Sequence, residues 1–271
     1  MPSDNSAEYG PRPLDLDTPN AARLYDCFLG GAHNTATDRK VAREFAAMAP
    51  HWTLGARLNR SFLRHAVRFM AEQGIDQFLD LGSGIPTVGN VHEIAQGMDP
   101  ACRVLYVDNE PVAVAHSELM LEENENAAIL QADLCDPDTV LGSESAQRLL
   151  DFDEPLALLT VAVLHFIPDS ADPRSAIARY LEALAPGSYF VLSHGTNDGL
   201  EEAPVEADES YQRTSTPGVA RTRAEIADLM AGTELIEPGI VWTPLWRPDS
   251  PDDIDDHPER SLVYAAVARK P

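Results

Sequence analysis

The chain has 271 residues, 44% of them hydrophobic, which is enough to bury the core of one large α/β domain. Its 44 acidic and 20 basic side chains give a formal net charge of −24. So large a negative charge repels the phosphate backbone of nucleic acids and the surface of anionic membranes, and it argues against both as partners. Much of this charge lies in residues 201–209 and 249–259, which we expect to form exposed loops.

The sequence shows neither a targeting signal nor a cysteine motif. The first residues have no basic start and no apolar segment of signal-peptide length, and nowhere do 18 apolar residues follow one another. Cys27, Cys102 and Cys135 form no C-x-x-C pair and lack zinc-site spacing. We therefore expect a cytoplasmic protein with reduced thiols, no metal site and no membrane segment.

The N-terminal part of the chain reads as helical. Residues 1–17 are polar and rich in proline, so we expect a mobile arm. Thr18 followed by Pro19 predicts the start of a helix with Tyr25 on its apolar face. We expect residues 18–74 to form a helical cap. The predicted helices of this cap cover residues 18–29, 38–48 and 54–73.

From residue 75 onward, apolar strands alternate with amphipathic helices. This alternation predicts a mainly parallel sheet with helices on both faces. The last two strands have no helix between them and are expected to pair antiparallel. We expect this core to span residues 75–271. The predicted strands cover residues 77–81, 103–108, 127–131, 156–164, 188–193, 236–246 and 261–268, and the predicted helices cover residues 87–97, 111–123, 137–150, 172–185 and 221–231.

Polar residues follow several of the predicted parallel strands, and ligands of open α/β sheets bind beyond the carboxyl ends of the strands. The stretch FLDLGSG leads a buried strand into Gly82 and Gly84, which let the backbone bend sharply and approach a ligand closely. Asp108 ends the next strand, where a carboxylate can accept both hydroxyls of a ribose or cap the following helix. Asp133, after the third strand, can accept from an adenine amino group or cap a turn.

Three of these segments, DLGSGIPT, VDNEP and QADLCDP, together resemble the cofactor motifs of class I S-adenosylmethionine-dependent methyltransferases. Over residues 14–270 the chain resembles the actinomycete-type S-adenosyl methyltransferase family, formerly catalogued as a domain of unknown function. The segment TPNAARLYDCFLGGAHNTATDR at 18–39 is similar to the N-terminal signature of that family. The resemblance implies a bacterial protein with a Rossmann-like, mainly parallel sheet of seven strands in the order 3-2-1-4-5-7-6, the last strand antiparallel.

The resemblance also implies S-adenosylmethionine as the cofactor and assigns residues to it. The residues of the glycine turn would line the methionine part, those after the second strand the ribose, and those after the third strand the adenine. The implied cofactor-binding residues are Asp80, Gly82, Ser83, Gly84, Asp108, Asn109, Asp133 and Leu134, with Tyr25 from the cap.

The acceptor side is less determined by the sequence. His165, directly after the fourth strand, is the candidate catalytic residue, because related enzymes place acceptor-side residues there and a histidine can act as a base near neutral pH. Its alternative is a histidine hydrogen-bonded in a tight turn. His194 and His33 are further candidates of the same kind. Tyr25 and Phe166 can place an aromatic ring near the sulfonium, or they belong to the core.

Four signature residues have no chemical role that the sequence reveals, and we interpret them as part of a helical lid over the methionine end of the cofactor. They are Asp26, His33, Asn34 and Arg39.

These observations predict a methyltransferase that acts on a small molecule. The alternative is a non-catalytic protein that senses S-adenosylmethionine. An NAD(P)-dependent oxidoreductase fits less well, because Thr87 stands where G-x-G-x-x-G has its third glycine and because Asp80 suits an ammonium group better than a pyrophosphate. The acceptor, the methylated atom and the oligomeric state stay open.

Overall fold

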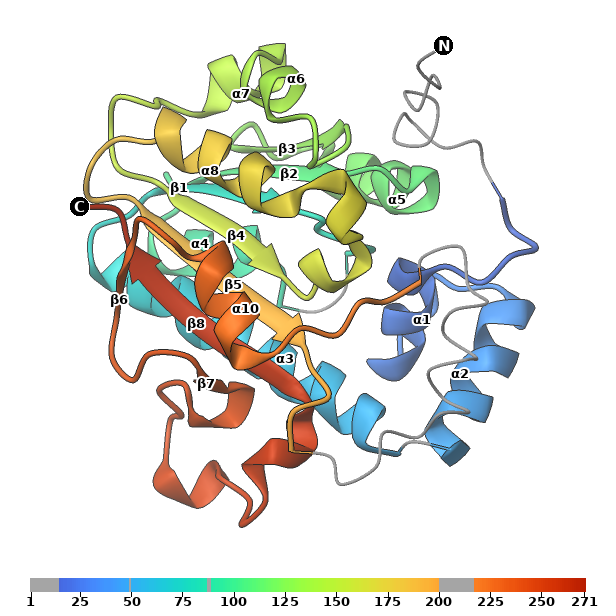
Figure 1. Cartoon of the computed structure of the whole chain (residues 1–271). Coiled ribbons are helices and arrows are strands. Elements are labelled where there is room, and N and C mark those ends of the chain that lie inside the picture. Colours follow the sequence, from blue (N-terminus) through green and yellow to red (C-terminus); the bar gives the residue numbers. More distant parts are fainter. Residues whose placement is uncertain (1–14, 49, 87–88, 200–216) are drawn as a thin grey trace, which may run out of the picture.

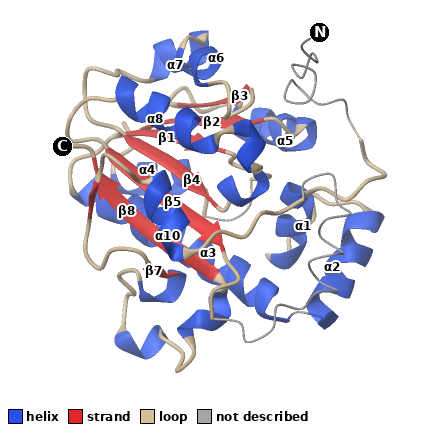
Figure 2. Ribbon diagram, viewed as in Figure 1, coloured by secondary structure: helices blue, strands red, loops and turns tan. Residues whose placement is uncertain are grey.

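The computed structural model describes residues 15–48, 50–86, 89–199 and 217–271. A single sheet forms its centre, with helices on both faces (Figure 1; Figure 2). The acidic run 201–209 lies outside the described residues. Within the described ranges, none of the helices combines the length and the apolar character needed to span a bilayer.

The sheet has eight strands in the order β3-β2-β1-β4-β5-β8-β6, with β7 also paired to β8. The first five strands run parallel, and β8 pairs antiparallel with β5, β6 and β7. This order confirms the predicted class I methyltransferase architecture, with β8 as the antiparallel strand beside β5. The strands are β1 (Gln77–Leu81), β2 (Arg103–Asp108), β3 (Ala127–Gln131), β4 (Ala157–Val161), β5 (Tyr189–Gly195), β6 (Glu234–Leu235), β7 (Val241–Trp242) and β8 (Val263–Arg269).

Each face of the sheet is covered by its own set of helices, because alternate residues of the buried strands point to opposite sides. Leu79 and Leu105 pack with α6, α7, α8 and α10, whereas Phe78 and Val104 pack with α3 and α4. The helices that surround the sheet are α3 (Pro50–Glu72), α4 (Val91–Met98), α5 (Pro111–Leu121), α6 (Pro137–Leu141), α7 (Glu144–Leu149), α8 (Pro173–Ala183) and α10 (Arg223–Leu229).

Two further helices, α1 (Ala21–Phe28) and α2 (Ala36–Met48), lie beside the carboxyl ends of β4 and β5 (Figure 1). Leu24, Phe28 and Phe45 form a small apolar cluster of their own with Ala56, near the start of α3. The rest of α3 packs against the sheet. Because α3 belongs to both clusters, this one helix connects the sheet to α1 and α2, which together with the start of α3 are called the cap below.

Three predicted elements differ from the structure by more than a shift of their ends. Asn20, not Thr18, caps α1, since its side chain accepts a hydrogen bond from the Ala22 N–H at 2.8 Å. The predicted helix 137–150 is two helices, because Ser143 caps a new one at Glu144. The predicted strand 236–246 contains only β7, because β6 ends at Leu235, before this range; between the two strands Pro238 lacks an N–H and Gly239, with φ +83°, turns the chain.

Candidate active site

A cavity of about 300 Å³ lies at the carboxyl ends of the parallel strands, between the core and the cap. Residues of α1, of α3 and of the loops after β1, β2, β3, β4 and β5 line it together. The structure brings all ten candidate site residues to this cavity, and Phe166 as well: Tyr25, Asp80, Gly82, Ser83, Gly84, Asp108, Asn109, Asp133, Leu134 and His165. His194 and His33 are not among the lining residues.

The turn after β1 depends on two glycines in the left-handed region. Gly82 has φ +71° and Gly84 has φ +68°. A Cβ on Gly82 would stand 2.1 Å from Cγ2 of Val163, so a side chain there would push away the loop after β4. A Cβ on Gly84 would meet no atom within 4 Å. Gly82 therefore allows the loops after β1 and β4 to come into contact, whereas Gly84 faces open space.

The carboxylate of Asp108 holds two backbone segments at once. Its Oδ2 accepts from the Gly84 N–H at 2.7 Å and its Oδ1 accepts from the Glu110 N–H at 2.8 Å. It does not cap α5, because the N-cap of that helix is Glu110. A carboxylate offers about four acceptor positions, so it can bind both segments and a diol.

Asp80 is buried at the end of β1, with 7% of its surface exposed. Burial raises the pKa of its carboxyl group to about 7; nearby Asp108 adds to the rise, and Arg60 opposes it. A buried carboxylate with a raised pKa favours a cationic partner, because a nearby positive charge stabilises its ionised form.

Asp133 serves as a turn residue. Its Oδ1 accepts from the Cys135 N–H at 2.8 Å, which was the alternative considered from the sequence. The residue still lines the cavity, as does the buried Leu134. A turn role and a role toward an adenine ring are therefore compatible in space.

His165 lies in the turn after β4 and its ring is held from one side. Its Nδ1 accepts from the Gly195 N–H at 3.2 Å, so in the neutral ring the hydrogen sits on Nε2. Burial, His194 and Arg221 hold its pKa well below its usual range. A neutral ring in this tautomer donates from Nε2, and its Nδ1 lone pair is already engaged.

Arg221, which the sequence did not single out, ties the acceptor-side loops together. It is buried, and its guanidinium donates to the carbonyl oxygens of Leu164 and Ile167, to Nε2 of His194, and to Asp169. Burial lowers the pKa of His194 to about 4, so this ring is a neutral structural partner. The ends of β4 and β5 are thereby fixed around the cavity.

A second chain of hydrogen bonds joins the cap to the same strand ends. The hydroxyl of Tyr25 donates to the Ala56 carbonyl at 3.1 Å and accepts from Nδ2 of Asn59 at 3.0 Å. Ser193 donates to Oδ1 of Asn59 at 2.5 Å and accepts from the N–H of Ala162, whose φ is +57°. Asn59 shares a helix face with apolar residues, which was the available sequence signal for a buried polar link.

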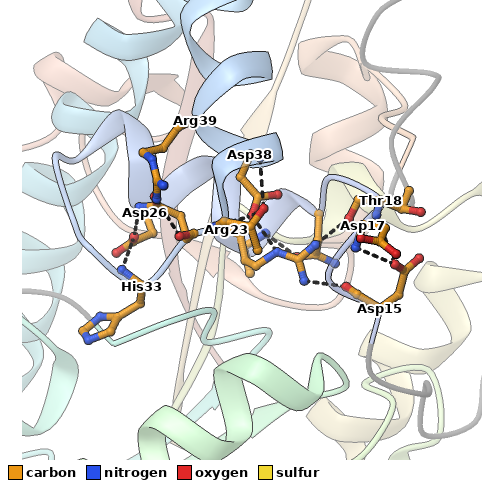
Figure 3. Close-up of polar contacts among 12 residues, drawn as sticks. Asp15, Asp17, Thr18, Arg23, Asp26, His33, Asp38 and Arg39 are labelled. Carbon is orange, nitrogen blue, oxygen red and sulfur yellow. Dashed lines mark hydrogen bonds and ion pairs between the residues drawn. The ribbon is translucent and has the colours of Figure 1, made fainter.

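The signature residues of the cap make polar contacts in the loop between α1 and α2 (Figure 3), and none of the four is among the residues that line the cavity. Oδ2 of Asp26 accepts from the His33 N–H at 2.9 Å and from Nδ2 of Asn34 at 2.7 Å. Arg39 donates to the backbone and side-chain oxygens of Asn34. A Cβ on Gly31 would stand 1.9 Å from Oδ1 of Asp26. The side chains of Asp26, Asn34 and Arg39 therefore hold the loop of the cap, and His33 takes part through its backbone N–H.

The residues present fit S-adenosylmethionine. The buried Asp80 suits its ammonium group, Asp108 suits its ribose hydroxyls, and the buried Ser83 hydroxyl has no partner among the described residues. Together with the sheet order, this cavity defines the class: a class I S-adenosylmethionine-dependent methyltransferase.

The model of the S-adenosyl methyltransferase family matches residues 7–271, and the chain belongs to this family. S-adenosylmethionine is accordingly its cofactor, and the family favours methyl transfer over NAD(P) chemistry. No curated protein matches the sequence.

Two crystal structures are similar over nearly the whole chain. A proposed methyltransferase from Thermobifida fusca YX is 39% identical, with a TM-score of 0.88, and the match covers 94% of this chain and 96% of the other. A DUF574 family protein from Streptomyces avermitilis MA-4680 is 36% identical, with a TM-score of 0.90, and the match covers 95% of this chain and 99% of the other.

Proposed function

We propose that this methyltransferase acts on a small, largely apolar molecule held between the cap and the loops after β4 and β5. The observation that carries the proposal is the extent of the cavity. Besides the carboxylates of Asp80 and Asp108, its lining includes apolar residues of the cap and of the segment after β5, among them Phe28, Trp52 and Val219. A protein that only sensed the cofactor would need no such extension.

The cofactor would lie along the ends of β1, β2 and β3. In this proposal Asp80 faces the ammonium group, Asp108 and Asn109 face the ribose, and Asp133 with Leu134 faces the adenine. When bound, S-adenosylmethionine supplies the electrophilic methyl group. The chain supplies alignment and a site shielded from water, since an in-line displacement mainly requires positioning.

His165 would contact the acceptor as a hydrogen-bond donor. Its engaged Nδ1 and lowered pKa support donation from Nε2 more than proton abstraction. We therefore replace the expected general base with a group that binds an oxygen or a ring nitrogen of the acceptor. The nucleophilic atom of the acceptor must then have a free lone pair at neutral pH without the help of a base.

Calorimetric titration with S-adenosylmethionine, S-adenosylhomocysteine, NAD⁺ and NADP⁺ tests the cofactor site. We expect binding of the two sulfur nucleosides only, lost in Asp108→Ala and kept in the control Asp228→Ala, which removes an exposed carboxylate on α10. Binding of a dinucleotide instead would overturn the proposed site.

Turnover separates the enzyme from the sensor. Release of S-adenosylhomocysteine would be followed with a panel of aromatic amines, ring-nitrogen heterocycles and partly ionised thiols as acceptors. Release above background with at least one of them is expected. Tight cofactor binding with release that never exceeds background across the panel would favour the sensor.

A further inference from the structure

Arg23 of α1 is a buried cation that holds three parts of the molecule together (Figure 3). Only 1% of its surface is exposed. Nε donates to Oδ2 of Asp38 at 2.9 Å, and Nη1 donates to Oε1 of Glu110 at 3.1 Å. The guanidinium also donates to the carbonyl oxygens of Asp15 and Thr18. A planar fork of donors suits such a divergent set of acceptors, which a lysine could not serve.

Glu110 connects this cluster to the cofactor side of the cavity. Its carboxylate accepts from Arg23 at one oxygen and from Nδ2 of Asn20 at the other, at 3.1 Å in both cases. Its backbone N–H donates to Oδ1 of Asp108 at 2.8 Å. Glu110 therefore connects Arg23 and Asn20 of the cap to Asp108, the carboxylate that we assign to the ribose.

Asp38 connects the same cation to α2. Its Oδ2 accepts from the backbone N–H of Thr35 at 2.8 Å and from the Thr35 hydroxyl at 2.7 Å, so it fixes the start of that helix. Asp38 is fully buried and Glu110 is 8% exposed. Removing the cation would leave two buried carboxylates without their counter-charge, and such a loss is strongly destabilising.

We propose that Arg23 is a positioning residue for the cofactor: it sets the place of the Asp108 carboxylate through Glu110, and it thereby couples docking of the cap to binding of the ribose. The coupling rests on the proposed role of Asp108. It is reciprocal, because any free energy by which a docked cap favours the cofactor must also favour the docked cap when the cofactor binds.

A double-mutant cycle with S-adenosylhomocysteine as the ligand tests this coupling. Glu110→Gln keeps the shape of the side chain but removes its charge and replaces one of its two acceptor oxygens with a donor. Arg23→Lys keeps the charge but removes the fork. We expect each to weaken binding by about tenfold in calorimetry. In an Asp108→Asn background the same changes should cost less than about threefold, because the group they position is already impaired. Arg64→Lys is the matched control; its exposed pair with Asp249 lies outside the cavity, and its affinity should not change.

Hydrogen exchange gives a second measurement, which would not change if Arg23 and Glu110 only stabilised the fold. The ligand should slow exchange in residues 15–38 of the wild-type protein, and this protection should be lost in Glu110→Gln at equal helicity by circular dichroism. Should Arg23→Lys fail to fold, Glu110→Gln carries the test alone.

Losses that add in the cycle, or unchanged affinity in folded variants, would overturn the coupling alone. Absence of ligand binding by the wild-type protein would overturn the proposed cofactor site, and the coupling with it.

Discussion

At the scale of single residues, the most informative group is the Asp80 carboxyl. A buried carboxyl group with a pKa of about 7 changes its protonation state near neutral pH, whereas an exposed aspartate is fully ionised there. Its charge state therefore becomes part of the binding equilibrium of any cationic ligand that it contacts.

We expect the affinity for S-adenosylmethionine to rise between pH 6 and pH 7.5. Below about pH 7 the free protein holds a proton on Asp80 that the ligand's ammonium group must displace, so affinity falls as the pH falls. Calorimetry in two buffers with different ionisation enthalpies would measure the released proton. Asp80→Asn should bind weakly with little pH dependence; an unchanged pH profile in this variant would assign the effect elsewhere.

His165 should remain neutral throughout the same range. Its lowered pKa and the Gly195 hydrogen bond predict ¹⁵N chemical shifts of the Nε2–H tautomer that do not change between pH 5.5 and pH 8. Histidine-labelled protein would show this by NMR, with His165→Gln used to assign the signal. A titration of His165 centred near pH 6.5 would restore the general base as a candidate.

At the scale of elements, the parallel strands and the strand-end carboxylates could be predicted because their signals are local. A buried strand and the residue that ends it lie within a few positions of each other, as in β1 and β2. The partners of Glu110, Asn59 and Arg221 could not be predicted, because they lie far away in the sequence. The bounds of the dipeptide strands β6 and β7 could not be predicted for the same reason, since only their pairing with β8 defines them.

The link between α1, α3 and β5 depends on Asn59. Asn59→Ala would leave the buried Ser193 hydroxyl without its acceptor and Tyr25 without a donor, so we expect a loss of about 1–3 kcal/mol in the free energy of unfolding. Urea denaturation would measure it. Asn126→Ala, which removes an exposed hydrogen bond to the Pro100 carbonyl, should cost less than about 0.5 kcal/mol. Equal small losses in both variants would contradict a structural role for this link.

At the scale of the whole molecule, the net charge of −24 is the dominant property. Among the described residues, Arg23 and Arg221 use buried positive charge to join separate segments, while most carboxylates lie at the surface. Self-repulsion of so many like charges opposes the compact state, and salt screens it.

Added salt should accordingly stabilise the fold. We expect the midpoint of thermal unfolding to rise by a few degrees between 20 mM and 300 mM NaCl, because the Debye length shortens from about 20 Å to about 6 Å. Differential scanning calorimetry would measure it, with equal concentrations of sucrose as a control for osmotic effects. A midpoint that falls with salt would show that attractive ion pairs outweigh the repulsion.

The two dipeptide strands also bear on how the protein behaves when concentrated. Both β6 and β7 pair with β8, and the chain turns away from the sheet between them. The outer edge of β8 is therefore covered by two short strands. A strand from another molecule finds little continuous unpaired backbone there to pair with. A parallel sheet whose last strand is closed in this way resists growth into fibrils from that side, even where surface charge has been neutralised by acid.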